Sequence, residues 1–289
     1  MGDYWEIISF GRGIKRVTKA KEIIDCTGDS DIVRLLGLGV LWAEERQPGA
    51  YEYKIERIEH GQLFDKEVQT LYEEAMNNGI LKKGDFAYSQ KTAFIRYLIP
   101  GGHNATHIYD SDTSDAHGQT RANLEGRERM LRMFTFVRTS IPGCERAELK
   151  LMYPYALARE TYRTEGEYIV TKDDFLKARD FKDKVCNAFN YIDLHCQKHG
   201  FEDYYLESKD LLPKVPFRSL IPKGSSRITV AGRVVSADRM AHAAIRSMCN
   251  CMAMGQAMGA AAALGGVPSR EIDSKDIVAL TIEHGAVRP

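Results

Sequence analysis

Hydrophobic and polar positions at the start of the chain follow the pattern of a β-hairpin. Two runs rich in β-branched and aromatic residues, 5–10 and 14–18, flank Gly11–Arg12–Gly13, whose glycines suit a tight turn. A short apolar run at 23–25 then leads into a polar, glycine-containing loop, and a helix is predicted at 32–36. A strand that ends in such a loop before a helix is typical of α/β folds, in which backbone amides lie at the carboxyl end of the strand.

Two of the predicted helices carry N-cap signals. Ser30 and Asp31 precede the helix at 32–36, and Asp273 or Ser274 begins a helix that reaches residue 284. The side-chain oxygens of these residue types accept hydrogen bonds from the first helical amides. We therefore expect both helices to be capped by these residues.

The middle of the chain, residues 41–214, has mixed charge and amphipathic helical stretches at 64–77 and 126–138, which predict an inserted α+β layer. Its least regular part, residues 100–118, is typical of a surface loop. A metal site in this loop is a less favoured alternative. Its candidate ligands are His103, His107, Asp110, Asp112, Asp115 and His117.

After a crossing with two prolines near residue 215, the chain returns to an α/β pattern. A β-branched strand at 227–233 closes on a glycine, and the long helix after it carries Gly255 and Gly259 among alanines. Glycines at this spacing expose backbone on one helix face, so that either a packed sheet or a flat cofactor ring can approach closely. Residues 227–266 therefore predict a strand, turn and helix that form one wall of a dinucleotide-cofactor site.

Composition narrows the class of protein. The 289 residues are 44% hydrophobic and 28% charged, as in soluble globular proteins. Lys and Arg together number 40, as do Asp and Glu, so no long-range field concentrates nucleic acid or an anionic membrane surface. The six cysteines show no zinc-site spacing, and no secretory signal opens the chain. The apolar run at 251–267 is too rich in glycine for a membrane span, so we expect a cytoplasmic protein with reduced thiols.

Several short motifs are spread over nearly the whole chain. They are residues 24–31, 141–143, 159–163 with 166–168, 191–195, 216–222, 231–233 with 236–238, and 246–263. In these motifs and their order, the chain resembles the FAD-dependent oxidoreductases related to the fumarate reductase and succinate dehydrogenase flavoproteins. The resemblance implies an α/β fold in which residues 1–40 and 215–289 form a partial, Rossmann-like FAD-binding domain. It also implies that residues 41–214 form an inserted cap domain that covers the flavin and holds the substrate.

The resemblance also implies which residues border FAD. The Thr27–Gly28–Asp29 loop and Gly232–Arg233 lie beside the cofactor, and the helix that begins near Met252 aims its amides at the N1–C2 carbonyl edge of the flavin. Such donors stabilise the negative charge of reduced flavin. The predicted cofactor-binding residues are Thr27, Gly28, Asp29, Gly232, Arg233, Ser236, Met252, Met254, Gly255 and Gln256.

Four polar residues are expected over the flavin ring. Arginine suits a carboxylate or another oxyanion, and histidine moves a proton near neutral pH, so we expect a small anionic organic substrate. Each residue also has a structural alternative, because arginines often pair with acids and histidines are often only hydrogen-bonded. The four predicted catalytic residues are Arg159, Arg163, His195 and Arg246.

One departure from the family concerns the phosphate-binding turn. Family members begin with a strand and a Gly-x-Gly-x-x-Gly turn that grips the FAD pyrophosphate. Neither Gly11–Arg12–Gly13 nor Gly37–Leu38–Gly39 has the third glycine at the required spacing. We therefore expect the chain alone to bind FAD weakly or not at all.

Three explanations of this departure are left open. A separate chain could supply the Gly-rich half of a split oxidoreductase, the chain could be a truncated enzyme, or it could be a non-catalytic partner or structural remnant. A sheet without its first strands exposes an unpaired edge and an apolar face, which favours a complex with a partner chain or a homo-oligomer.

Overall fold

The computed structural model describes residues 4–58, 65–86, 106–196, 200–208 and 210–289. The chain divides into two compact units. The first unit comprises Met1–Ala43, Tyr162–Leu194 and Asp203–Pro289, and the second comprises Glu44–Thr161 and His195–Glu202.

The N-terminal hairpin of the first unit confirms the sequence pattern. Strands β1 (Trp5–Gly11) and β2 (Ile14–Ala20) pair antiparallel, with Gly11 opposite Ile14. Arg12 and Gly13 form the two-residue turn with φ of 46° and 78°. Positive φ at both positions matches the type I′ turn, whose twist suits a hairpin.

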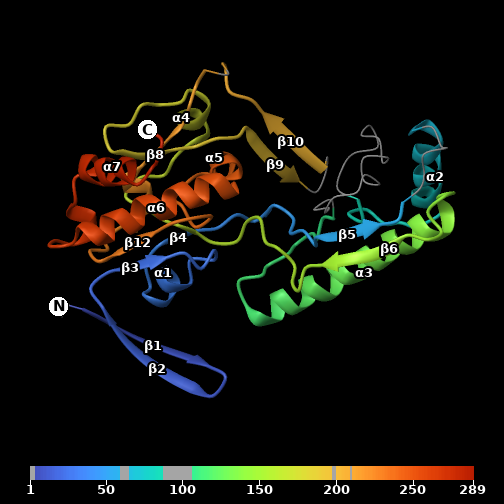
Figure 1. Cartoon of the computed structure of the whole chain (residues 1–289), viewed down its shortest axis with the longest axis horizontal. Helices are drawn as coiled ribbons and strands as arrows, with labels where there is room; N and C mark the ends of the chain where they lie inside the picture. Colours follow the sequence, from blue (N-terminus) through green and yellow to red (C-terminus); the bar gives the residue numbers. More distant parts are fainter. Residues whose placement is uncertain (1–3, 59–64, 87–105, 197–199, 209) are drawn as a thin grey trace. The chain divides into compact units, whose positions relative to one another are not determined.

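A parallel strand pair lies at the centre of the first unit (Figure 1). Strand β3 (Ile23–Asp25) pairs with β12 (Ile228–Val230), with Asp25 opposite Val230. Helix α1 (Asp31–Leu35) follows β3. Helices α5 (Arg239–Ile245) and α6 (Met248–Leu264) follow β12.

Further elements of the first unit surround this pair. Helix α6 packs beside α7 (Ser274–Glu283) (Figure 1). As predicted, Asp273 caps α7 by accepting a hydrogen bond from Lys275 N. The remaining elements are β4 (Val40–Leu41) paired with β7 (Arg163–Thr164), β8 (Lys184–Asn187) paired with β11 (Lys214–Pro216), α4 (Lys172–Leu176), and the 3-10 turns η2 (Phe217–Leu220) and η3 (Ser269–Glu271). Their apolar side chains share one core that includes Val33, Val230 and Met258.

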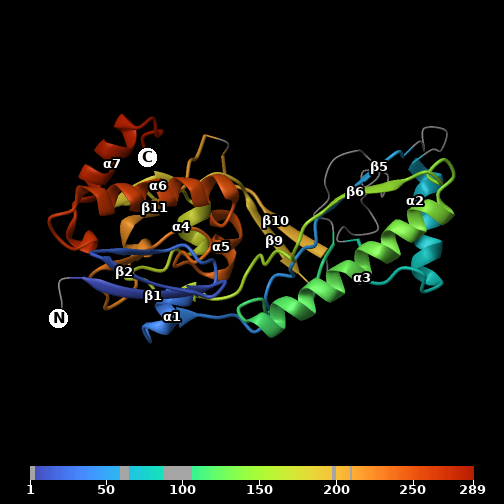
Figure 2. The same cartoon turned by 60° about the horizontal axis from the view of Figure 1, so that its bottom comes forward.

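The second unit has its own core. Strands β5 (Tyr53–Glu56) and β6 (Glu148–Met152) pair antiparallel, and helices α2 (Asp65–Asn77) and α3 (Ala116–Ser140) belong to the same unit (Figure 2). Strands β9 (Ile192–Cys196) and β10 (Gly200–Tyr204) pair with each other, and residues 195–202 of this hairpin belong to the second unit while its outer ends belong to the first. The core of this unit gathers Tyr51, Met133 and Phe136 among others.

The units divide the chain differently from the predicted domains. The predicted insertion is residues 41–214, but 41–43, 162–194 and 203–214 belong to the first unit. The reason is strand pairing, because β7 pairs with β4 and β8 pairs with β11. The mixture of helices and strands agrees with the predicted α/β class. None of the helices in the described part of the chain is long and apolar enough to cross a membrane.

The predicted surface loop at 100–118 needs correction. Residues 100–105, including His103, lie outside the described residues, whereas most of residues 106–113 are buried. Helix α3 begins inside the predicted loop, where the Asp115 carboxylate accepts a hydrogen bond from Gly118 N at 2.7 Å. Among the described residues, no group of three or more His, Cys, Asp or Glu side chains could hold a metal ion.

Candidate functional site

Two loops of the first unit meet where β3 and β12 end. Because the strands are parallel and in register, their carboxyl ends lie at the same edge, and Ala231 N donates a hydrogen bond to Asp25 O at 3.1 Å. The loop at 26–30 and the turn at 231–233 leave from this edge. Ligands of open α/β sheets bind outside the carboxyl ends of the strands.

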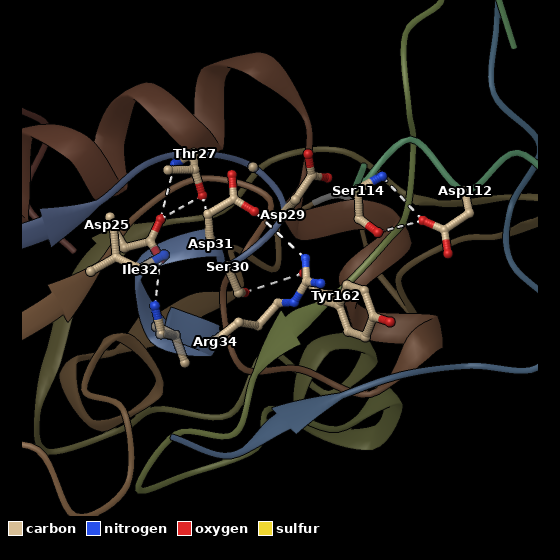
Figure 3. A network of polar contacts seen from close by, with 12 residues as sticks. Asp25, Thr27, Asp29, Ser30, Asp31, Ile32, Arg34, Asp112, Ser114 and Tyr162 are labelled. Carbon is tan, nitrogen blue, oxygen red and sulfur yellow. Dashed lines mark hydrogen bonds and ion pairs between the residues drawn. The ribbon is translucent and has the colours of Figure 1, made fainter. Parts of the chain in front are cut away.

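The Asp25 carboxylate shapes the loop after β3 (Figure 3). Its Oδ1 accepts hydrogen bonds from Thr27 N at 3.0 Å and Thr27 Oγ1 at 2.7 Å. Its Oδ2 accepts from Ile32 N at 3.0 Å and Val33 N at 3.1 Å, and so caps α1. The fully buried charge is thereby balanced by hydrogen-bond donors from the loop and the helix.

The prediction that Ser30 caps α1 is wrong. Ser30 has a left-handed backbone with φ of 54°, and its Oγ donates to Tyr162 O at 3.3 Å instead (Figure 3). The first helical amide, Asp31 N, donates to Thr27 Oγ1 at 3.0 Å. The cap therefore comes from Asp25 and Thr27, which lie before the sharp turn at Ser30.

Arg233 joins the two loops. Its Nε donates to Gly28 O at 2.7 Å, and its Nη2 donates to Asp29 Oδ1 at 2.8 Å. Gly28 has φ of +89°, and a Cβ there would lie 2.7 Å from the guanidinium carbon of Arg233. Only glycine fits this position without displacing the arginine. The structure thus brings together five of the predicted cofactor-binding residues, Thr27, Gly28, Asp29, Gly232 and Arg233.

His242 on α5 holds the Arg233 turn from behind, and sequence reasoning did not identify it. The side chain is fully buried, and its Nε2–H donates to the Arg233 carbonyl at 2.7 Å. Burial, followed by the charges of Arg163 and Arg246, lowers the pKa of His242 well below its ordinary value. The neutral ring is therefore a fixed donor to the turn. Arg163 and Arg246 lie close enough for their charges to affect its pKa.

Helix α6 begins earlier than predicted. Its first residue is Met248, and Cys251 N already donates to Ser247 O at 3.0 Å. Because each later amide bonds four residues back, the N-terminal amides of the helix belong to residues 248–250 and not to Met252. The expectation that the helix begins near Met252 is therefore wrong.

The predicted residues of α6 divide between the core and an exposed face. The Met254 side chain is fully buried in the core, whereas Met252 is 72% exposed and Gln256 is also exposed. A Cβ added at Gly255 or Gly259 would meet nothing within 4 Å. Tight packing therefore does not explain either glycine.

A hollow lies beside this face of α6. It has a volume of about 460 Å³ and lies between β8, α6 and the residues after α7. Met252 and Gln256 line it together with Phe189 and Val287. Its lining is mostly apolar, which suits a flat or aliphatic group more than a charged one.

Ser236 has a packing contact. It is fully buried, and its Oγ accepts a hydrogen bond from Gly166 N at 3.0 Å. A Cβ at Gly166 would lie 2.8 Å from Ser236 Cβ, so the two backbones approach closely. The side chain thus joins the β12–α5 connection to the segment after β7.

The second unit contains the other two predicted catalytic residues, Arg159 and His195. Arg159 is 7% exposed, and its Nη1 donates to Pro48 O at 2.8 Å. His195 on β9 donates its backbone N–H to Gln47 Oε1 at 3.3 Å, and its ring Nδ1 lies 2.7 Å from Nε2 of His107. The four predicted catalytic residues therefore divide between the units, with Arg163 and Arg246 in the first and Arg159 and His195 in the second.

Comparison with known proteins gives one result for nearly the whole chain. The model of the family described as FAD dependent oxidoreductase matches residues 2–279. No curated protein matches significantly. No solved structure matches significantly either. The chain therefore belongs to the FAD dependent oxidoreductase family, and FAD is its cofactor.

Proposed function

We propose that this chain supplies the flavin-facing wall and the substrate-holding residues of an oxidoreductase of the fumarate reductase and succinate dehydrogenase type. The observation that carries the proposal is the meeting of the Thr27–Gly28–Asp29 loop with Gly232–Arg233 at the carboxyl edge of β3 and β12. Both loops belong to one unit, so their contact is a property of a single compact body.

The residues at this edge fit a flat cofactor. Gly232 has φ of +90°, and the nearest atom to an added Cβ is Cys251 Sγ at 4.0 Å. Gly255 and Gly259 on α6 likewise leave open space. When bound, FAD supplies the transfer of electrons to or from the substrate. Arg233 holds the loop beside it, and the amides of residues 248–250 add positive potential at the start of α6.

The proposed substrate is a small organic anion. Arg159 and Arg163 are 7% and 4% exposed, and a guanidinium in such surroundings binds a carboxylate more strongly than one in water. His195 is the proposed proton carrier of the reaction, because imidazole gains and loses a proton near neutral pH. In this proposal Arg159, which lies in the same unit as His195, orients the substrate, and His195 moves a proton to or from it.

We propose that residues outside these 289 bind the FAD pyrophosphate. The 289 residues themselves contain no Gly-x-Gly-x-x-Gly sequence. Ile23 N donates to Arg227 O, and Asp25 O accepts from Ala231 N, so the backbone of Ile24 points to the opposite edge of β3. In the part of the chain that the structure describes, β12 is the strand paired with β3. We place the strand that carries the Gly-rich turn at that other edge.

Flavin retention tests the proposal. The purified 289-residue chain is expected to be colourless, and co-expression with a segment or partner that carries Gly-x-Gly-x-x-Gly is expected to give a yellow protein with a bound-flavin spectrum. Stoichiometric FAD in the isolated chain would contradict the shared site. A complex that binds no flavin under any condition would favour the non-catalytic alternative.

Two matched variants test the place of the flavin. Gly255→Leu puts a side chain into the open space proposed for the ring and is expected to weaken FAD binding at least 10-fold. The folded state is expected to be kept because the added Cβ points into space with no other packed atom within 4 Å. Ala263→Leu makes a similar change on an exposed position two turns further along α6 and serves as the control. Equal FAD affinities of the two variants, measured by fluorescence titration of the complex, would argue against this placement.

A further inference from the structure

A pair of histidines in the second unit forms a direct contact. Nε2 of His107 and Nδ1 of His195 are 2.7 Å apart, and their rings meet edge to face with centroids 4.9 Å apart. At this distance one nitrogen carries the proton and donates, and the other accepts. The two residues are 88 positions apart in sequence, so the fold builds this pair.

The backbone on both sides holds the pair in place. His107 is fully buried, and its N–H donates to Gly84 O at 2.8 Å. Gly84 has φ of +93°, and a Cβ there would lie 2.7 Å from the Tyr109 ring, so this approach requires glycine. On the other side, the His195 N–H donates to Gln47 Oε1. Both rings therefore start from fixed backbone positions.

The surroundings keep His107 neutral. Burial is the main cause that lowers its pKa to about 2, and the positive charges of Arg159, His195 and Arg129 act in the same direction. The Tyr109 ring also meets it edge to face, with centroids 5.9 Å apart. At any pH near neutrality His107 therefore has one N–H and one lone pair, and it does not compete with His195 for a proton.

We propose that His107 is a positioning residue for His195, in which Nε2 of His107 accepts the hydrogen bond from Nδ1–H of His195. This inference rests on the proposed function, in which His195 carries the proton of the redox reaction. A protonated His195 has donors on both nitrogens, so a neutral His107 must accept from it. The same hydrogen bond persists when His195 is neutral, because the proton then leaves from Nε2.

The arrangement assigns one role to each nitrogen of His195. Nδ1 keeps its proton and holds the ring, and Nε2 gives a proton to the substrate or takes one from it. No proton passes to His107, so the proton balance concerns only His195 and the substrate. His107 thus orients His195 as a carboxylate orients the catalytic histidine of a triad, except that the acceptor here is a neutral imidazole.

Nuclear magnetic resonance tests the pair without any turnover. In the full chain labelled with ¹⁵N-histidine, long-range ¹H–¹⁵N correlations report the protonation of each ring nitrogen between pH 5 and 9. We expect His195 Nδ1 to stay protonated throughout while Nε2 titrates, and His107 not to titrate. A neutral His195 without a proton on Nδ1, or titration of His107 in this range, would overturn the inference.

Turnover of the flavin-loaded complex gives a second, independent test, with fumarate as the probe and reduced methyl viologen as the electron donor. His107→Phe removes the acceptor and is expected to lower kcat about 100-fold with little change in KM, because a misplaced catalytic group costs about that much. His107→Asn restores an acceptor oxygen and is expected to recover at least a tenth of the activity. His117→Asn, at an exposed position on α3, is the control.

The variant His107→Asp distinguishes an orienting effect of residue 107 on the His195 ring from a general effect on the stability of the protein. His107→Asp places an anion beside His195, which favours the imidazolium and is expected to move the corresponding limb of the pH profile to higher pH. Loss of turnover in His195→Gln with full activity in His107→Phe would overturn the positioning role. If His195→Gln retains full activity, the catalytic histidine of the proposed function fails, and the nitrogen protonation pattern alone decides whether the pair exists.

Discussion

Polar side chains hold backbone carbonyls in both units. Arg233 binds the Gly28 carbonyl and Arg159 binds the Pro48 carbonyl, both far away in the sequence, whereas His242 binds the carbonyl of Arg233 in the preceding turn. Motif order predicted Arg233 and Arg159 as functional residues. Nothing in the sequence marked His242, and His107 was named only as a candidate metal ligand and not as the partner of His195. A single buried histidine leaves no periodic signal, and its partner is set by folding.

The two buried histidines predict how stability depends on pH. Burial lowers the pKa of both His107 and His242 in the folded state, whereas unfolding exposes them to water. The unfolded state therefore binds more protons below about pH 6.5, and stability is lost as pH falls through this range. Each histidine is expected to contribute up to about 1.4 kcal/mol of destabilisation per pH unit.

Denaturant unfolding at pH 7, 6 and 5 measures this dependence. His242→Gln removes one buried titrating group and is expected to reduce the slope of stability against pH. His284→Gln removes an exposed histidine and is the control. A slope that is the same in wild type and His242→Gln would contradict the assignment of this histidine.

At the scale of elements, strands and caps differ in how well the sequence predicts them. The hairpin, β3, β12 and the start of α7 agree with the patterns of β-branched residues, glycines and N-cap residues. The caps of α1 and the start of α6 do not, because local residue types permit several solutions and tertiary contacts select one. For α1, the buried carboxylate of Asp25 reaches the helix from the preceding strand.

The glycines before and after α1 predict unequal effects of two similar substitutions. Gly28→Ala and Gly37→Ala both place alanine at positive φ, which costs about 1 kcal/mol at each position. At Gly28 the new methyl group also meets the Arg233 guanidinium, whereas at Gly37 it meets nothing within 4 Å. We expect Gly28→Ala to lower thermal stability more and to weaken FAD binding by the complex. Equal losses in thermal melts and flavin titrations would show that the contact with Arg233 does not matter.

At the scale of the whole molecule, the described residues form two cores that share no member. The core of the first unit includes Met258 and that of the second includes Met133, and both side chains are fully buried. The two tryptophans, Trp5 and Trp42, both belong to the first unit. Tryptophan fluorescence therefore reports on one unit, whereas far-ultraviolet circular dichroism reports on the helices of both.

Matched core substitutions test whether the cores unfold separately. Met133→Ala and Met258→Ala each remove the same buried atoms and are expected to cost about 2–5 kcal/mol. Met258→Ala is expected to shift the denaturation midpoint measured by fluorescence, and Met133→Ala only the one measured by circular dichroism. A shift of the fluorescence midpoint by Met133→Ala would show that the two units unfold as one.

The sequence by itself determined the family, the cofactor and the local elements, because these depend on motif order and on periodic patterns that residue types carry along the chain. Only the tertiary structure decided which residues meet. It joined Arg233 to Gly28 and Asp29, paired His107 with His195, and returned residues 162–194 to the first unit. The physical reason is that strand pairing, burial and hydrogen bonding between distant segments are satisfied jointly, and no local pattern contains that information.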